Sequence, residues 1–396
     1  MDHFSIVLAL ARSALQNPNV AVRQHLERLQ EALTSAGSSE EARALSKLLS
    51  GDERSGKIEP TRVILTRAVV AGEVMSPTVR PPADRETGNL LAQIVHPAQL
   101  NDRPLVFNAS LQPAVDSLVE EWTHLEKFLA LSVRPPLNCL LFGAPGTGKT
   151  QLARAIAKRL ELPLVVARLD GLISSFLGTT ARNIASLFDF ANRYQCVLLL
   201  DEFDAIAKIR DDPHEVGEIK RVVNTLLQCL DSRSSIGFTL AITNHEQLLD
   251  SAIWRRFDVR VHVPKPDFAS RQAIVERYTA GITLSDADRR LLAWFTEGRS
   301  GAEIETLCNA ILRMFVLKKS DDFSMAEALR VNAQLSADFR ESPRQQKLVG
   351  EFEALARTLV TDEDVRFTQG ELAQIFNRDQ STISRWLKQD GVPRRR

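Results

Sequence analysis

The octapeptide Gly-Ala-Pro-Gly-Thr-Gly-Lys-Thr at residues 143–150 constrains the fold of this chain more than any other sequence feature. It satisfies the pattern G-x-x-x-x-G-K-[S/T], it follows an apolar run, and it precedes a helical pattern. Glycines let backbone amides curl around phosphate oxygens, and the N-terminus of the next helix adds partial positive charge. The sequence therefore predicts a strand, a phosphate-binding loop and a helix in direct succession.

The residues of this loop are candidates for binding a nucleotide. Lys149 should reach the β- and γ-phosphates as a point charge, and the Thr150 hydroxyl should ligate Mg²⁺. We expect nucleotide contacts from Gly143, Ala144, Pro145, Gly146, Thr147, Gly148, Lys149, Thr150 and Gln151. A glycine-rich turn with a stray lysine is the simpler alternative, but the surrounding strand and helix patterns argue against it.

Short β-rich runs alternate with helical patterns on both sides of the loop. The runs are residues 137–142, 162–166, 197–200, 238–242 and 260–263, and helical patterns at 151–160 and 181–192 separate some of them. Alternation of this kind predicts an α/β fold with a parallel sheet that is covered on both faces.

Polar residues follow two of these predicted strands. Asp201 and Glu202 come directly after four consecutive apolar residues, and Asn244 comes shortly after the run at 238–242. Acids at the carboxyl end of a buried parallel strand emerge beside the phosphate loop. We expect Asp201 to hold Mg²⁺, Glu202 to orient and deprotonate the attacking water, and Asn244 to hydrogen-bond the γ-phosphate and that water.

Two adjacent arginines, Arg255 and Arg256, lie on the segment that follows Asn244. A basic pair is usually a solvated surface. Guanidinium groups are also suited to bidentate phosphate contacts, and a pair that points out of its own subunit can contact a neighbour's nucleotide. The sequence does not decide which arginine makes the main contact.

The order of these motifs resembles the AAA family, the core branch of the AAA+ ATPases, over residues 92–314. Residues 240–258 resemble the second region of homology that distinguishes this branch. The resemblance implies an ATPase with ATP and Mg²⁺ as cofactors. It also implies a ring-shaped homo-oligomer, usually a hexamer, that remodels or unfolds a protein substrate. In such a ring the arginines act across the subunit boundary, so a lone subunit should be a poor ATPase.

The resemblance assigns two further sites. Gly301 and Ala302 match the lid segment whose small residues pack against adenine, where only a small side chain leaves room for backbone to approach a base. Phe176, Leu177 and Gly178 match the loop that lines the central pore, where an aromatic ring grips an extended polypeptide by apolar contact. The alternative for Phe176 is that it packs in the sheet core.

Composition shifts divide the chain into six expected parts. These are an N-terminal helical domain at 1–74, a proline-rich extended linker at 75–88, the α/β nucleotide-binding domain at 89–266, an α-helical lid at 267–335, a helical connector at 336–366 and a separate C-terminal unit at 367–396. Three amphipathic stripes in the first fifty residues predict a small three-helix bundle. That bundle can dock a partner or simply pack against the next domain.

The C-terminal unit has the features of two helices joined by a tight turn. Thr368 and Glu371 form an expected capping box, Asn377 suits a left-handed turn residue, and a second helix should run over 380–389. The unit resembles a homeodomain-like helix-turn-helix. The exposed residues that would contact DNA are Gln380, Ser381, Thr382, Ser384, Arg385 and Lys388. A unit of this kind can also bind proteins or cap the lid.

Charge and cysteine usage exclude several classes of protein. Lys plus Arg and Asp plus Glu each number 50, so the formal net charge of 0 argues against a generally polyanion-binding protein. No run reaches the roughly 18 apolar residues of a membrane span, and we expect neither a signal peptide nor a membrane partner. Four dispersed cysteines fit reduced thiols, so we expect a cytoplasmic protein.

The leading functional hypothesis is a ring ATPase that remodels a protein threaded past Phe176. The domain order also resembles bacterial ATPases that are encoded beside subtilisin-like proteases in anti-phage defence. Neither H-E-x-x-H nor G-x-S-x-G occurs, so proteolysis would need a partner protease. The alternative is an ATP-switched DNA-binding regulator that acts through residues 367–396. A scaffold with a degenerate ATPase is disfavoured because Lys149, Asp201 and Glu202 are intact.

Overall fold

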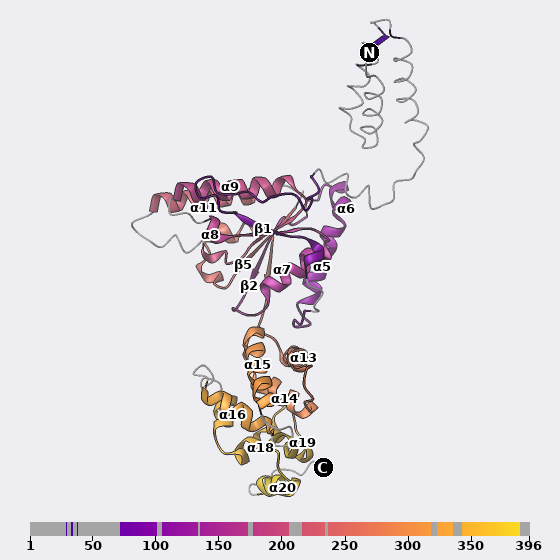
Figure 1. The fold of residues 1–396 in the computed structure, drawn as a ribbon, viewed down its shortest axis with the longest axis vertical. Coiled ribbons are helices and arrows are strands. Elements are labelled where there is room, and N and C mark those ends of the chain that lie inside the picture. Colours follow the sequence, from indigo (N-terminus) through magenta and orange to yellow (C-terminus); the bar gives the residue numbers. More distant parts are fainter. Residues whose placement is uncertain are drawn as a thin grey trace. The chain divides into compact units, whose positions relative to one another are not determined.

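The structure is a computed structural model of the 396-residue chain. It describes residues 29, 33, 34, 38, 72–100, 105–133, 135–172, 177–205, 216–233, 237–317, 323–335 and 343–388. Contacts between Cα atoms divide the chain into two units, Met1–Val69 and Val70–Arg396, and nearly all of the described residues belong to the second unit (Figure 1). The predicted N-terminal three-helix bundle lies almost entirely outside the described residues.

The described part contains a six-stranded sheet with the order β1-β3-β4-β5-β2-β6. The strands are β1 (Ala92–Val95), β2 (Asn138–Phe142), β3 (Leu164–Ala167), β4 (Val197–Leu200), β5 (Phe238–Thr243) and β6 (Val259–His262). All neighbouring strands run parallel except β1, which pairs antiparallel with β3. The α/β fold with a mainly parallel sheet is confirmed, but the sequence analysis did not predict β1.

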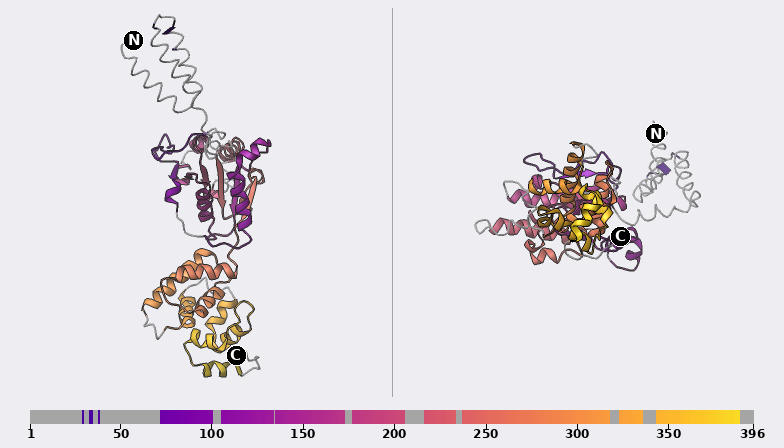
Figure 2. Two further views of the ribbon diagram at one scale, coloured as in Figure 1. Left: turned by 90° about the vertical axis from the view of Figure 1, so that its right-hand side faces the viewer. Right: turned by 90° about the horizontal axis from the view of Figure 1, so that it is seen from below.

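Helices cover both faces of the sheet. The helices of the α/β part are α5 (Gln112–Thr123), α6 (Leu125–Ala130), α7 (Lys149–Arg159), α8 (Leu169–Leu172), α9 (Leu177–Arg193), α11 (Val216–Asp231) and α12 (Ser251–Trp254), with short 3-10 turns η1 (Pro97–Gln99) and η3 (Glu246–Leu248). In β2, Leu140 packs on the side of α9 and α11, whereas Cys139 and Leu141 pack on the side of α5 and α7. Figure 2 shows the strands and the surrounding helices from two further directions.

Segment 75–88 packs against the α/β domain, and the expectation of an extended linker there is wrong. Met75 is only 4% exposed and belongs to the apolar core beside α9. Ala83 forms a β-bridge with Leu90, and the Asp84 carboxylate accepts hydrogen bonds from the Glu86 amide and the Thr87 hydroxyl. Prolines exclude a helix here, as expected, but they do not prevent a non-helical backbone from packing.

The remaining described elements are all helices. They are α13 (Phe268–Thr279), α14 (Asp286–Phe295), α15 (Gly301–Leu317), α16 (Met325–Leu335), α17 (Pro343–Val349), α18 (Phe352–Thr361), α19 (Gln369–Phe376) and α20 (Gln380–Lys388). One continuous apolar core joins them, from Ile274 in α13 to Leu387 in α20. None of the helices in the described ranges is both long and apolar enough to cross a membrane.

The C-terminal helices therefore share one core with the lid helices, which fits the alternative that this unit caps the lid rather than stands apart from it. The Arg290 guanidinium of α14 pairs with Glu371 of α19 at 2.7 Å, and Trp294 donates its indole N–H to Asp362 at 2.8 Å. The Ser324 hydroxyl donates to the Ile375 carbonyl. A short amphipathic helix is stable only when its apolar face packs against another apolar surface. Helices α14 and α16 provide that surface for α19.

Local features of α19 and α20 follow the sequence closely. The Thr368 hydroxyl accepts from the Glu371 amide, and the Glu371 carboxylate accepts from the Thr368 amide. Asn377 ends α19 in the left-handed conformation, with φ of 49°. Ile383 and Leu387 of α20 are buried against α18 and α19.

Replacement of Phe376 by alanine tests whether the lid and the C-terminal helices form one cooperative body. Phe376 is buried against Phe352 and Trp386, so we expect Phe376→Ala to lower the free energy of unfolding by about 3–5 kcal/mol. Hydrogen exchange should then accelerate in α14 and α15 as well as in α19. The exposed Gln374→Ala on the same helix is the control, and unchanged exchange in α14 would contradict a shared core.

Candidate nucleotide-binding site

The phosphate loop joins β2 to α7, as the motif predicts. Gly143, Gly146 and Gly148 all have positive φ, at 141°, 74° and 95°. A Cβ atom at Gly143 would collide with the Val263 carbonyl of the strand segment beside it, so that position admits only glycine. Helix α7 begins at Lys149, two residues earlier than expected, and its N-terminus therefore faces the loop directly.

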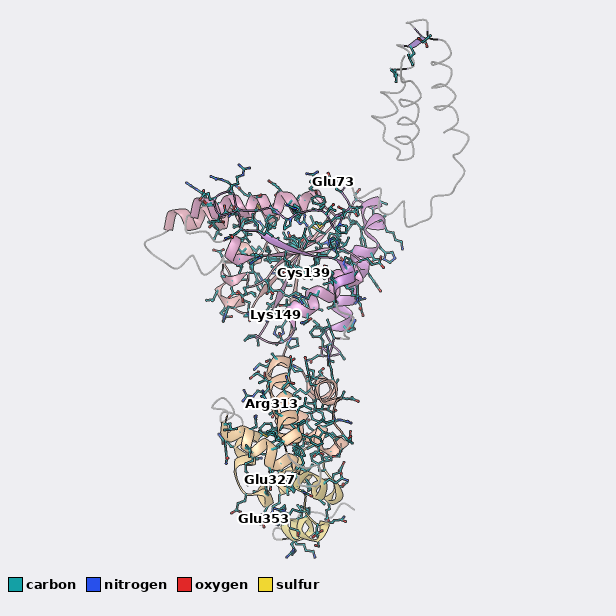
Figure 3. The ribbon with its side chains drawn as sticks, in the orientation of Figure 1. Glu73, Cys139, Lys149, Arg313, Glu327 and Glu353 are labelled. Atoms are coloured by element: carbon teal, nitrogen blue, oxygen red, sulfur yellow. The ribbon has the colours of Figure 1, made fainter. Side chains whose placement is uncertain are left out.

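The Lys149 side chain is folded into the loop. It is 4% exposed, and its ammonium group donates to the Gly143 carbonyl at 2.8 Å and the Ala144 carbonyl at 2.7 Å. Burial lowers the pKa of Lys149 from its ordinary value, while the nearby Asp201 carboxylate opposes that shift. Figure 3 labels Lys149 at the edge of the sheet, with Cys139 near the start of β2.

Thr150 and Asp201 lie side by side although 51 residues separate them. The Thr150 hydroxyl, on the first turn of α7, donates to the Asp201 carboxylate at 2.9 Å. A hydroxyl and a carboxylate are both hard oxygen ligands. Mg²⁺ in nucleotide sites is bound by one or two such protein groups together with phosphate oxygens and water, so this pair fits the ion.

Glu202 lies at the turn after β4, in a strained backbone conformation. Its φ is 51°, which is uncommon for a residue with a side chain and costs about 1–3 kcal/mol. Two hydrogen bonds hold the turn: the Glu202 amide donates to the Asp201 carboxylate, and the Phe203 amide donates to the Ile242 carbonyl of β5. The turn leaves the Glu202 side chain exposed in the same cavity that Asn244 lines.

A cavity of about 800 Å³ collects most of the predicted nucleotide-binding residues. Its lining includes Pro145, Gly146, Thr147, Gly148, Lys149, Thr150, Gln151, Asp201, Glu202, Asn244, Gly301 and Ala302. Gly143 and Ala144 are absent from the lining, and their carbonyls instead face Lys149. No motif pointed to the lining residues Phe107, Asn108, Ile274, Tyr278 and Glu305.

Asn108 illustrates why local sequence motifs did not predict some of the residues that line the cavity. Its side chain donates to the Lys265 carbonyl at 3.2 Å and accepts from the Asp267 amide at 2.9 Å. It therefore fastens the segment before α5 to the junction between β6 and α13. The contact joins residues about 160 positions apart, so no local pattern encodes it.

The lid touches the phosphate loop at Gly146. The Ala302 amide, on the first turn of α15, donates to the Gly146 carbonyl at 3.1 Å. A Cβ atom at Gly146 would lie 2.8 Å from the Ser300 hydroxyl and 3.0 Å from the Ala302 Cβ. Position 146 thus needs glycine both for its left-handed backbone and for close approach of the lid.

Other predicted functional residues lie outside this cavity. Arg255 is exposed after α12, and Arg256 pairs with Asp231 at 2.5 Å, so neither arginine lines the cavity of its own chain. Phe176 lies outside the described residues. Leu177 and Gly178 are the first two residues of α9.

Two glycine substitutions separate backbone strain from contact with the lid. Gly146→Ala and Gly298→Ala both place a side chain on a left-handed residue, with φ of 74° and 72°, and each should cost about 1–2 kcal/mol of stability. Only Gly146→Ala also collides with Ser300 and Ala302. We therefore expect Gly146→Ala to weaken nucleotide binding at least tenfold in a fluorescent-ATP titration, and Gly298→Ala to leave it unchanged. Equal losses in both variants would contradict the lid contact.

The chain is similar to known proteins in sequence and in fold. Residues 139–265 match the family described as "ATPase family associated with various cellular activities (AAA)". The chain is 32% identical over 302 residues to y4kL, an uncharacterised AAA family ATPase of Sinorhizobium fredii, and the match covers 74% of this chain and 90% of that protein. It is 33% identical over 213 residues to the proteasome-activating nucleotidase of Methanopyrus kandleri, which covers 52% of this chain.

The match spans only about half of the Methanopyrus protein, 49% of its length. Among solved structures, the crystal structure of the FIGL-1 AAA domain aligns with a TM-score of 0.50 at 25% identity, over 60% of this chain and 85% of that chain. A relative that aligns over 90% of its own length, and a family match that includes the phosphate loop, Asp201 and Asn244, show that this chain belongs to the AAA family of ATPases.

Proposed function

We propose that this protein is a Mg²⁺-dependent ring ATPase, assembled as a hexamer, that uses ATP hydrolysis to remodel or unfold protein substrates. The observation that carries the proposal is the arrangement of Lys149, Thr150, Asp201 and Glu202 around one cavity, while the arginine pair lies outside it. The groups that would bind ATP and activate water line this one cavity. Arg255 is exposed and is therefore available to a neighbouring subunit.

ATP binding would begin with a change of partners at Lys149. Its ammonium group now donates to two loop carbonyls, and phosphate oxygens would replace them. Backbone amides of the loop would hold the remaining phosphate oxygens, and Gln151, Gly301 and Ala302 would lie on the adenine side. Thr150 and Asp201 would hold Mg²⁺, which supplies charge neutralisation at the phosphates.

Hydrolysis would depend on Glu202 and Asn244. Glu202 extends a carboxylate into the cavity from a turn that two hydrogen bonds hold in place, and it would orient and deprotonate the attacking water. Asn244 would hydrogen-bond the γ-phosphate and the water without adding charge. A guanidinium group of the pair Arg255–Arg256 would complete the site from the adjacent subunit, so that assembly and turnover are linked.

The protein substrate would be gripped by the loop of Phe176, Leu177 and Gly178. An aromatic ring binds an extended polypeptide by apolar contact and shows little sequence preference. Likeness to a proteasome-activating nucleotidase supports a protein substrate over a nucleic acid. Because the chain contains neither common protease motif, degradation would require a partner protease, as in the defence systems that the expected domain order resembles.

Removal of the Phe176 ring in an ATP-trapped background tests substrate handling directly. Glu202→Gln should bind ATP without turnover and, with ATP, bind fluorescently labelled casein as a model unfolded polypeptide. Adding Phe176→Ala should weaken casein binding at least tenfold, about 1.4 kcal/mol. Phe176→Ala alone should hydrolyse ATP within twofold of the unaltered protein.

The control for this pair is Leu131→Ala, which removes another large apolar side chain that is 75% exposed on the α/β domain. It should leave casein binding unchanged. The pore assignment would be contradicted if casein bound equally strongly with and without the Phe176 ring while Phe176→Ala alone still hydrolysed ATP. The ATPase assignment would then remain intact.

A second candidate function is ATP-switched regulation through DNA, and the exposed face of α20 favours it. Gln380, Ser381, Arg385 and Lys388 are exposed, whereas Ile383 and Leu387 are buried against the lid. Amide, hydroxyl and cationic groups on one helix face suit base edges and phosphates. Thr382 and Ser384, the other predicted contacts, are half-buried, and Thr382 accepts a hydrogen bond from Arg385 at 3.2 Å.

Arg385→Ala tests the DNA hypothesis. If α20 contacts phosphates, the variant should bind a 30-base-pair DNA duplex more weakly. The slope of the logarithm of the binding constant against the logarithm of the salt concentration should also be smaller by about one, because one phosphate contact is lost. Fluorescence anisotropy across a salt series measures both quantities. Arg313→Ala removes another exposed arginine, from α15 (labelled in Figure 3), and should have no effect. Equal behaviour of the two variants would favour a protein-contact role for α20.

A further inference from the structure

The segment from Trp254 to Asp258, which carries the arginine pair, is anchored to the α/β domain at both ends. The Trp254 ring packs against Phe142 at the end of β2, with centroids 5.4 Å apart. Phe257 is 2% exposed and packs edge-on against Phe203, at 5.6 Å and 86°. This segment therefore has a defined position relative to the phosphate loop and the Glu202 turn of its own subunit.

Polar contacts anchor the same segment through β2. The Asp258 carboxylate accepts hydrogen bonds from the backbone amides of Leu137 at 2.8 Å and Asn138 at 3.1 Å. The buried Asn138 side chain donates to the carbonyls of Leu230 at 3.2 Å and Arg256 at 3.4 Å. Asn138 thus joins the C-terminal end of α11 to the backbone of the arginine segment.

The two arginine side chains have different surroundings. Arg256 Nε lies 2.5 Å from the Asp231 carboxylate, at the end of α11, in an ion pair without a well-aligned hydrogen bond. The Arg255 side chain is exposed, and no described residue forms a hydrogen bond or ion pair with its guanidinium. The pair therefore divides into one cation neutralised within its subunit and one that is not.

We propose that Asp231 holds Arg256 within its own subunit as a positioning pair, and that Arg255 alone reaches the triphosphate bound by a second copy of this chain. The inference rests on the proposed function, because it requires an ATP site that a neighbouring subunit completes. It adds a division of labour within the arginine pair and assigns a role to Asp231.

Electrostatics favours this division. If Arg256 moved to a neighbour's phosphates, the Asp231 carboxylate would lose its partner close to incoming negative charge. With the ion pair kept, Arg255 is the member of the arginine pair whose charge no described carboxylate of its own subunit pairs with. The ion pair is partly exposed, at 39% for Arg256 and 51% for Asp231, so its own contribution is modest and its effect should be on orientation.

Steady-state ATPase assays on the full-length, assembled protein test the division. Arg255→Ala should lower kcat about 10³-fold and lower fluorescent-ATP affinity far less, because each cavity keeps the lining residues of its own chain. Arg256→Ala and Asp231→Ala should each lower kcat only about two- to fivefold. Because both remove the same contact, the double variant should be no worse than either single one.

Conservative and matched variants exclude a merely structural effect. Asp231→Glu should restore kcat, because it keeps a carboxylate within reach of Arg256. Asp116→Ala breaks a comparable surface ion pair, between Asp116 and Arg159 at 2.6 Å with exposures of 38% and 42%, and should leave kcat unchanged. A kcat loss for Arg256→Ala as large as that for Arg255→Ala, with Asp231→Ala unaffected, would overturn the division.

A mixture of two inactive variants tests whether the ATP site is shared between subunits, which the proposed function requires. Its result is independent of how Arg255 and Arg256 divide their roles within the pair, which the single variants test. Lys149→Ala subunits lack a nucleotide site but keep Arg255, whereas Arg255→Ala subunits bind ATP but lack that arginine. A mixture of the two should hydrolyse ATP faster than either protein alone. No recovery in the mixture would contradict a site shared between subunits, and with it the proposal for Arg255.

Discussion

The hydrogen bond between Thr150 and Asp201 is the contact on which the nucleotide site depends, because it joins the helix after the phosphate loop to the end of β4. The two residues meet because parallel strands place their carboxyl ends at one edge of the sheet. Strand β5 lies between β2 and β4 in that sheet, and it brings Asn244 to the same edge. The Glu202 turn is held there by the Ile242 carbonyl of β5. The arrangement of the chemical groups therefore follows from strand order.

The lid adds a second surface to this edge. Its contact with the loop is narrow, because the Ala302 amide and the Ser300 side chain meet a single glycine at position 146. The same lid core extends through α14 and α16 to α19 and α20. The exposed face of α20 is consequently fixed to the body that contacts the phosphate loop. A partner of α20 is thermodynamically linked to nucleotide binding if its affinity for α20 differs between the nucleotide-free and the nucleotide-bound protein.

Local patterns predicted the parts of the fold that depend on a few consecutive residues. The four apolar residues of β4 predicted a strand buried on both faces, and Thr368 with Glu371 predicted the start of α19. The antiparallel pairing of β1 and the packing of Met75 depend on partners far away in the chain, which a local pattern does not encode. The same distinction applies to the candidate site. Its motifs are consecutive residues and could be predicted from the sequence, whereas the contacts of Asn108 and the Asp231–Arg256 ion pair join residues that only the fold brings together.

The central claim is that each ATP lies at a boundary between two copies of this chain. ATP turnover per subunit, measured across a dilution series alongside sedimentation velocity, tests it most directly. The account predicts that turnover per subunit is very low for the monomer and rises to a plateau as the oligomer forms. Equal turnover per subunit at every dilution, by a protein that sediments as a monomer throughout, would contradict it.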